Sequence, residues 1–501
     1  MIPSGARALR IRSLLLPVAL PFLFAVIAFS SWHPSAEICR ATAIVVCTLV
    51  VWISEIAPLG IVALGIPVAA TAAGLLTWTE ALSSWGDPIL FLFLGAFLLA
   101  RALDRHGAFD RLVGAIAGAA GTNAARLPSG VRLAGLVLLL SGTLSTVQNN
   151  TAVTAMLLPL ILPLARRTEF PSLALLALSF GATFGGMATP VGTAPNFLGF
   201  AAMKVINPSA SFLGWMCVGV PVWVGTSLLA WGLLALARRF PFARRPAVAG
   251  APGGEHWIES PVLPDVAPGH PPLAYADLSR PEHDRAAKRW AIAAFVATAL
   301  VWLTCGAIMS FTPEQHPLQQ FVRRFLPDSM IPIAAALLLF AIRTGPARRP
   351  VLEREDLHAI DWDTLFLIAG GLCLGRLLDK SGAAAALAQA VGHAQLPQVV
   401  MMLAIAGATT LLSELTSNTA TAALMVPIAK SLAPLLGGDP QQAILLVALS
   451  ASLGFALPVS TPPNAIVYGT RLIPLPLMVS VGLLVDVLSI GWVVACVLIL
   501  G

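Results

Sequence analysis

Residues 145–155 read STVQNNTAVTA, and residues 413–423 read SELTSNTATAA. Each polar cluster lies in the middle of an apolar run, over residues 132–165 and 398–432. As one continuous helix such a run would extend about 50 Å, whereas the hydrocarbon core of a bilayer is about 30 Å thick. Non-helical backbone is tolerated at that depth only where protein buries it or where it lines a cavity. Each run is therefore predicted to form a re-entrant helical hairpin with the polar cluster at its tip.

The composition of the whole chain is typical of a membrane protein. Its 501 residues are 57% hydrophobic and 11% charged, with a mean hydropathy of +0.85, whereas soluble domains carry about 25% charged residues. The net charge of +6 does not indicate a nucleic-acid partner, because the basic residues lie between apolar segments, where they set topology. The cysteines form no C-x-x-C pair and are interpreted as inert thiols: Cys39, Cys47, Cys217, Cys305, Cys373 and Cys496.

Apolar segments recur along the chain and predict an all-α polytopic membrane protein with about 11 transmembrane helices besides the two hairpins. The first run follows three arginines and lacks a clear cleavage site, so residues 1–31 are interpreted as a retained first helix rather than a signal peptide. The predicted spans are residues 13–31, 38–54, 57–77, 88–104, 174–200, 211–237, 289–310, 329–343, 362–379, 441–468 and 474–500.

An internal repeat organises the sequence. Gly95, Arg101, Asp104 and Gly107 recur 275 residues later, as Gly370, Arg376, Asp379 and Gly382. A second block recurs 268 residues later: Asn150-Thr151-Ala152, Pro159, Pro190, Thr193 and Pro195-Asn196 reappear as Asn418-Thr419-Ala420, Pro427, Pro458, Thr461 and Pro463-Asn464. Chance similarity between apolar segments would not preserve asparagines and prolines at a fixed spacing, so the chain is predicted to contain two copies of one unit.

The loop charges predict that the two copies have opposite orientations. Repeats are assigned to residues 32–238 and 288–501, separated by a linker over 239–287 that is rich in proline, glycine and charge. If the N-terminus is cytoplasmic, the first hairpin enters from inside and the second from outside, and the C-terminus ends outside. The arginines thereby placed inside are Arg7, Arg10, Arg12, Arg101, Arg105, Arg111, Arg126, Arg132, Arg166, Arg167, Arg238, Arg239, Arg244 and Arg245. Inverted repeats with broken midplane segments are typical of secondary transporters.

The chemistry of the tips suits an anion. Asn, Ser and Thr are good N-cap residues, and the chain becomes helical again after Asn150 and Asn418. A helix N-terminus offers free N–H groups and about half a positive charge, which favours a carboxylate or sulfate. The alternative is that these residues only hold helices together.

Two further motifs interrupt the spans after the hairpins, Gly192-Thr193-Ala194-Pro195-Asn196 and Ser460-Thr461-Pro462-Pro463-Asn464. Proline disrupts the preceding helical turn, so each span is predicted to break near the midplane and free carbonyl groups that can bind sodium. A plain proline kink is the alternative. Gly185-Gly186, upstream of the first motif, is explained equally well by close helix packing.

One acid lies close to a tip. Glu414 precedes Asn418 by four residues, about one helical turn. An acid at that depth is a functional candidate by default: it could balance sodium or carry a proton. The alternative is a carboxylate at the outer mouth, paired with a helix dipole or a lysine. Glu55 and Asp486 are lone acids at the edges of spans, with no role assigned.

At these residues the sequence resembles the divalent anion/sodium symporter family, whose members carry di- and tricarboxylates or sulfate. The family pattern is a Ser-Asn-Thr tip on each of two hairpins, each followed by a Gly-Thr-Pro-Pro-Asn or similar break in the next helix. Ser417-Asn418-Thr419 and Thr461-Pro462-Pro463-Asn464 match this pattern. The first copy departs from it, because Asn149 replaces the serine and Ala194 replaces the first proline.

The resemblance implies a scaffold domain that dimerises and a transport domain that contains the hairpins and the broken helices. It implies one sodium site at Ser145, Asn149, Asn150 and Gly192 and a second at Ser413, Thr416, Asn418 and Ser460. Substrate contacts are implied for Asn149, Asn150, Thr151, Thr193, Ser417, Asn418, Thr419 and Thr461.

The function hypothesis is sodium-coupled symport of a C4-dicarboxylate such as succinate, malate or fumarate by an elevator-type mechanism. The protein is expected to be a homodimer in the inner (plasma) membrane, with two or more sodium ions, no organic cofactor, no nucleic-acid partner and no enzymatic activity. The rival readings on the same fold are a sodium-independent dicarboxylate exchanger and a sulfate or tricarboxylate carrier. An ion channel would need an open pore lined by charges or carbonyl groups, and paired hairpins argue against one.

Overall fold

The computed structural model describes residues 23–30, 33–54, 57–108, 130–239, 285–313, 316–392, 396–436 and 438–501. The first repeat contributes α2 (Ala36–Ser54), α3 (Leu59–Ala72), α4 (Trp78–Ser83), a 3₁₀ turn η1 (Ser84–Gly86), α5 (Pro88–Arg105), α7 (Gly130–Ser145), α8 (Asn150–Arg166), α9 (Pro171–Met187), α10 (Ala194–Ile206) and α11 (Phe212–Ala237).

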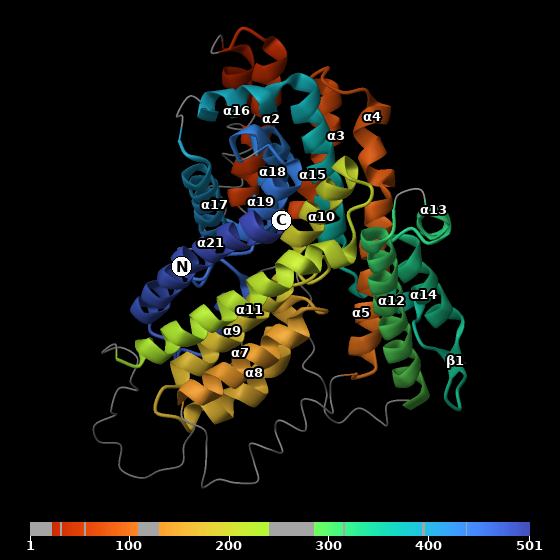
Figure 1. Cartoon of the computed structure of the whole chain (residues 1–501), viewed down its shortest axis with the longest axis vertical. Coiled ribbons are helices and arrows are strands. Elements are labelled where there is room, and N and C mark those ends of the chain that lie inside the picture. Colours follow the sequence, from red (N-terminus) through yellow and green to blue (C-terminus); the bar gives the residue numbers. More distant parts are fainter. Residues whose placement is uncertain are drawn as a thin grey trace, which may run out of the picture.

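The second half begins with α12 (Arg285–Phe311) (Figure 1). Then come α13 (Pro317–Phe325), α14 (Met330–Ala341), β1 (Arg343–Thr344), β2 (Arg349–Pro350), η2 (Arg354–Ala359), α15 (Trp362–Ser381), α16 (Ala383–Gly392), α17 (Gln398–Leu415), α18 (Asn418–Leu432), η3 (Ala433–Leu436), α19 (Pro440–Ala451), α20 (Pro462–Tyr468) and α21 (Leu475–Leu500).

This architecture confirms an all-α polytopic membrane protein, and the short antiparallel pair β1–β2 is the one sheet that the described residues form. Five described helices are each long and apolar enough to cross a membrane, and a sixth span is possible if α13 and α14, bent by 51°, count as one. The other apolar helices are shorter because breaks divide them. Most of the expected first helix and of the linker, together with Glu55, lies outside the described residues.

The sequence repeat reappears as a repeat of helix crossings. Gly95 of α5 lies where α14 crosses, so close that an added Cβ would be 2.6 Å from the backbone nitrogen of Ile333. Its counterpart Gly370 of α15 lies where α3 crosses, and there an added Cβ would be 2.6 Å from the Cβ of Ala63. Both helices also end near a glycine of positive φ, at Gly107 and Gly382. Glycine is needed at these places because a side chain would separate the helices or strain the turn.

The stretches that carry the tips are divided as the polar clusters predict. The first forms α7 and α8, joined by residues 146–149, and the second forms α17 and α18, joined by residues 416–417. The following spans are also interrupted, between α9 and α10 and between α19 and α20. Breaks therefore occur in all four stretches in which the sequence motifs lie.

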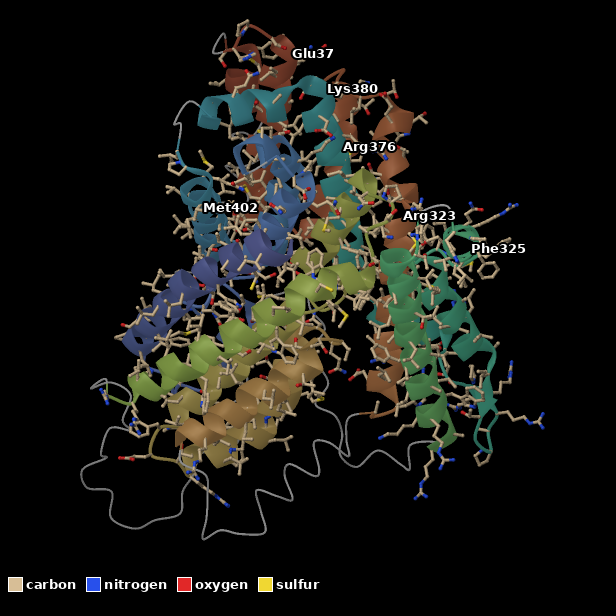
Figure 2. All side chains as sticks on the ribbon, in the orientation of Figure 1. Glu37, Arg323, Phe325, Arg376, Lys380 and Met402 are labelled. Atoms are coloured by element: carbon tan, nitrogen blue, oxygen red, sulfur yellow. The ribbon has the colours of Figure 1, made fainter. Side chains whose placement is uncertain are left out.

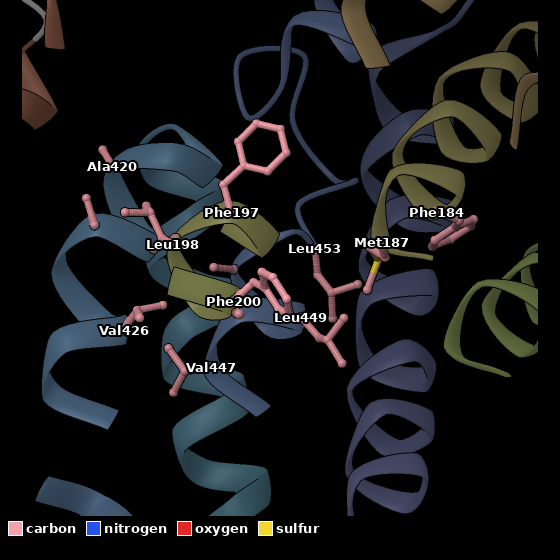
Figure 3. Packing of buried hydrophobic residues seen from close by; sticks show 14 of the residues in the cluster. Phe184, Met187, Phe197, Leu198, Phe200, Ala420, Val426, Val447, Leu449 and Leu453 are labelled. Atoms are coloured by element: carbon pink, nitrogen blue, oxygen red, sulfur yellow. The ribbon is translucent and has the colours of Figure 1, made fainter. Parts of the chain in front are cut away.

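The second half of each broken span packs against the other repeat. Helix α10 packs against α18 and α19, and α20 packs against α8 and α9. Figure 3 shows the first of these contacts, with Phe197, Leu198 and Phe200 of α10 inserted between the hairpin and α19. These apolar side chains are almost fully buried, so the two repeats form one continuous core around the breaks.

Ion pairs tie the surrounding helices together. Asp356 of η2 has a buried side chain that pairs with Arg101, at 3.0 Å, and with Arg105, both on α5. Helix α15 is linked to α4 through Lys380 and Glu80, 2.8 Å apart, and Figure 2 shows Lys380 at that end of α15. These links hold helices of different repeats side by side.

Candidate functional site

The two hairpin tips begin their second helices with side-chain caps. The carboxamide of Asn149 accepts a hydrogen bond from the backbone N–H of Thr151 at 2.8 Å. The hydroxyl of Ser417 accepts one from the backbone N–H of Ala420 at 3.1 Å. Each cap satisfies one of the four free N–H groups of its helix and leaves others available to a ligand. Asn149 is exposed and Ser417 is half-buried.

The first helical residue after each cap makes the same contact in both repeats. Ser145 donates its hydroxyl to the Oδ1 atom of Asn150 at 2.7 Å, and Ser413 donates to the Oδ1 atom of Asn418 at 2.8 Å. The two serines are fully buried, and the two asparagines are half-buried. The fold therefore brings together, within each hairpin, a serine and an asparagine that the family resemblance assigns to one sodium site.

Closely packed backbone surrounds both asparagines. An added Cβ at Gly186 would overlap the Oδ1 atom of Asn150, and one at Gly185 would overlap the backbone of Gly142 on α7. The Gly185-Gly186 pair is thus explained by close packing of α9 on the first hairpin. In the second repeat, Gly454 has a φ of +146°.

Three members of the second sodium set surround Gly454. A Cβ built on this glycine would lie 3.5 Å from Asn418 Oδ1, 3.5 Å from the Cβ of Ser460 and 3.8 Å from the carbonyl carbon of Ser413. Thr416 is different, because its hydroxyl is used within the hairpin, by the carbonyl of Leu412 at 2.9 Å and the hydroxyl of Thr421 at 2.7 Å. In the first set, Gly192 packs against the backbone of Gly186, next to Asn150.

The breaks leave fewer free carbonyl groups than the prolines alone would suggest. Asn196 donates its carboxamide N–H groups to the carbonyls of Gly186, Met187 and Thr189, at 2.8 to 3.1 Å. Its repeat counterpart Asn464 donates to the carbonyls of Gly454 and Leu457, both at 3.1 Å. Sequence reasoning noted both asparagines without giving them a role, although their recurrence at a fixed spacing was the available signal.

Thr193 and Thr461 begin the helices that follow the breaks. Thr193 is the N-cap of α10, which packs against the second hairpin, and Thr461 is the N-cap of α20, which packs against the first. The Thr461 hydroxyl accepts from the N–H of Asn464 at 3.3 Å. Thr151 and Thr419 lie in the first turns of the hairpin helices and are half-buried. The crossing of the repeats thus directs each break toward the opposite tip.

The two acids lie inside the protein and contact one loop. Glu414 accepts hydrogen bonds from the backbone N–H groups of Ala456, at 2.7 Å, and Leu457, at 3.2 Å, and from the hydroxyl of Ser460. Asp486 of α21 accepts from the N–H of Phe455 at 3.3 Å. The outer-mouth alternative for Glu414 is therefore wrong, since its side chain is buried against the second break. Leaving Asp486 without a role was a further omission, because a lone acid in an apolar helix was itself a signal.

Comparisons with known proteins agree with this geometry. A family model described as a citrate transporter, CitMHS, matches residues 49–447. An uncharacterized transporter of Haemophilus influenzae is 30% identical over 453 residues, which span 88% of this chain and 87% of that protein. The sodium-dependent dicarboxylate transporter SdcS of Staphylococcus saprophyticus is 27% identical over 468 residues, or 89% and 83% of the two chains. The crystal structure of the Alcanivorax borkumensis YdaH transporter, described as having an unusual topology, matches with a TM-score of 0.49 and 17% identity over 84% and 87%.

Proposed function

Since the chain belongs to the citrate transporter family, a family of the divalent anion/sodium symporter type, we propose that it carries a C4-dicarboxylate such as succinate, malate or fumarate together with sodium. It is a transporter and not an enzyme. The relatives named sodium-dependent dicarboxylate transporters support both the substrate class and the coupling ion.

One observation carries the proposal: the matched pairs Ser145–Asn150 and Ser413–Asn418, with distances of 2.7 and 2.8 Å. Each pair lies at the start of a helix whose N-terminal N–H groups favour an anion. The asparagine Oδ1 atom has a second lone pair for a cation, while the helix end beside it faces the anion. Two such tips suit the two carboxylate groups of one dicarboxylate.

The donor groups at both tips fit sodium, a hard cation that is bound by oxygen. Hydroxyl and carboxamide oxygens from Ser145, Asn150, Ser413 and Asn418 are supplemented by Ser460 and by the backbone at Gly192. The electrostatics require such cations, because two helix ends supply only about one positive charge against a dianion. Uncompensated charge in a low-dielectric cavity costs several kcal/mol.

The movement that we propose is an elevator-type displacement of the hairpins and broken helices against the remaining helices. The arginine distribution supports an N-terminus and linker in the cytoplasm and a C-terminus outside, in an inner (plasma) membrane. A homodimer formed by the remaining helices completes the proposal. Because α10 and α20 each bind the opposite hairpin through buried apolar contacts, both tips would move as one body.

Uptake of radiolabelled succinate into proteoliposomes tests the function. We expect uptake when sodium is outside and little uptake when choline or potassium replaces it at constant ionic strength. Unlabelled malate, fumarate, citrate and sulfate, added one at a time, should rank the substrates, with the C4-dicarboxylates competing best. Liposomes without protein are the control.

Sodium-independent uptake that requires a dicarboxylate inside the vesicle would contradict coupling and favour the exchanger. Stronger competition by citrate or sulfate than by malate would contradict the substrate class while leaving the transport function intact.

A further inference from the structure

A buried pair of acids lies behind the second break and has no basic partner. The exposed fractions of Glu414 and Asp486 are 6% and 4%, and their carboxyl groups lie within hydrogen-bonding range of each other. None of the ion pairs formed among the described residues includes either of them. Two carboxylates placed together in an apolar interior repel one another and lose their hydration, so they need a cation.

Unused oxygen atoms face this pair. The Oδ1 atom of Asp486 is buried and has no hydrogen-bond partner within the described part of the chain, and the same holds for the hydroxyl of Ser489. Ser489 is fully buried and lies three residues after Asp486 on α21, so both side chains occupy one face of that helix. That helix packs against α17, which carries Glu414, and against α19. Buried polar atoms without partners are uncommon and indicate a ligand that the protein chain does not supply.

The repeat shows that the fold itself does not require these acids. Gly482 of α21 packs against the second break, at Phe455 and Ala456, as Gly219 of α11 packs against the first break, at Met187 and Ala188. Counting four residues on from these glycines, Asp486 corresponds to Trp223.

The other positions of the pair also lose their polar or charged character in the first repeat. Glu414 and Thr146 each precede the tip asparagine by four residues. Ser489 corresponds to Thr226, whose hydroxyl is satisfied by the carbonyl of Val222 at 2.7 Å. The first repeat thus builds the same break with no acid and no unused oxygen at these places, which indicates a task specific to the second repeat.

We propose that Glu414, Asp486 and Ser489 form a further sodium site, separate from the two sites at the hairpin tips. The proposal rests on the sodium-coupled function proposed above. A shared proton would satisfy one pair of carboxyl oxygens and leave the Ser489 hydroxyl unused. A sodium ion takes several oxygen ligands and compensates the charge of the pair.

This site would act on transport through the break loop. Glu414 holds Ala456, Leu457 and Ser460, and Ser460 belongs to the second tip site. A cation that fixes Glu414 therefore orders the loop before the second tip site fills. Binding at the two places is positively coupled, and the coupling works in both directions.

The test measures the number of sodium ions carried per succinate, from the membrane potential at which net flux stops in proteoliposomes. We expect Asp486→Asn to carry one sodium ion fewer than the wild type. Ser489→Ala keeps the charge and should weaken the apparent sodium affinity about tenfold, the value of one hydrogen-bond-like contact to a charged group. Thr226→Ala, at the matching place in the first repeat, is the control and should behave as the wild type.

A second readout needs no transport. Thermal unfolding of the purified protein in detergent, without substrate, should be shifted upward by sodium chloride relative to choline chloride, and Ser489→Ala should need a higher sodium concentration for the same shift. This readout also covers the case in which Asp486→Asn does not fold.

The outcomes separate the two proposals. Wild-type uptake that ignores sodium would overturn the proposed function. Sodium-coupled wild-type uptake with an unchanged ratio in Asp486→Asn, or with unchanged sodium affinity in Ser489→Ala, would overturn the further site alone. Proton influx that accompanies succinate in the wild type and is lost in Asp486→Asn would also overturn it, because the pair would then hold a proton.

Discussion

At the residue scale, one carboxamide connects three parts of the second repeat. Asn418 accepts from Ser413 through Oδ1 and donates through Nδ2 to the carbonyl of Ser452 at 3.2 Å, at the end of α19. Asn150 repeats the first contact, with Ser145. An asparagine suits this place because it offers a donor and an acceptor on one short, rigid group.

We predict that Asn150→Ala and Asn418→Ala each weaken substrate binding by about 10- to 150-fold, which corresponds to one lost hydrogen bond to a charged group, worth about 1.5–3 kcal/mol. Asn207→Ala is a matched control, since Asn207 is also hydrogen-bonded, to Ser209 and Gln441, but lies at the far end of α10. Succinate binding to the purified variants, with a check of correct folding, provides the measurement. Near-normal binding by either tip variant would support the reading in which the asparagines only hold helices together.

A second residue-scale prediction concerns a buried ion pair. Asp356 is 1% exposed and pairs with Arg101 and Arg105, whereas the Arg101–Asp104 pair is 64% exposed at the aspartate. Asp356→Ala should lower the free energy of unfolding by about 3–5 kcal/mol, because it leaves buried charge uncompensated. Asp104→Ala should cost about 0–1 kcal/mol. Thermal unfolding in detergent distinguishes the two, and equal losses would contradict the argument.

At the scale of elements, the breaks depend on how closely helices approach. Helix α9 passes α7 with Gly185 against the backbone of Gly142, and α21 passes the second break with Gly482 against the carbonyl of Phe455. Backbone cannot rotate away as a flexible side chain can, so a single methyl group moves a whole element. This contact keeps the end of α9 beside Asn150.

Gly185→Ala is therefore expected to prevent correct packing of the first hairpin, with loss of both monodispersity and uptake. Gly407→Ala is the control, because Gly407 also lies in a hairpin helix but has open space around it, with nothing within 4 Å of an added Cβ. In a helix interior alanine is favoured over glycine by about 1 kcal/mol, so this variant should be as stable as the wild type or slightly more so. Size-exclusion profiles of the two variants are the measurement, and a normal profile for Gly185→Ala would show that α7 can give way.

At the scale of the whole molecule, the crossing of the repeats joins the two hairpins into one unit. Because α10 belongs to the first repeat and packs on α18, and α20 belongs to the second and packs on α8, neither tip can move far without the other. Ion pairs such as Lys430–Asp379, at 3.2 Å, then link this unit to α15. Both of these side chains are about half exposed, so the link is weak enough to break during movement.

The orientation of the whole molecule is also testable. A cysteine placed at Ser260, in the linker, should react with a membrane-permeant maleimide but not with an impermeant one in intact cells, and a cysteine added after Gly501 should react with both. The reason is that the arginines on both sides of the linker favour the cytoplasm. Labelling of the linker from outside would reverse the proposed topology.

The sequence by itself determined the membrane class, the helix spans and the places where they break. These are local properties: apolar length sets a span, and a polar tip or a proline interrupts it. The matched spacing of Asn150 and Asn418 even identified the residues that the fold places at the two tips.

Only the tertiary structure decided what the buried polar groups touch. Asn196 and Asn464 hold carbonyls of their own breaks, Thr416 bonds within its hairpin, and Glu414 faces Asp486 across more than 70 residues of sequence. The sequence could not show the last pairing, because the distance between α17 and α21 depends on side-chain packing between helices far apart in the chain. The cost of burying charge, and so the need for a cation there, follows from that packing.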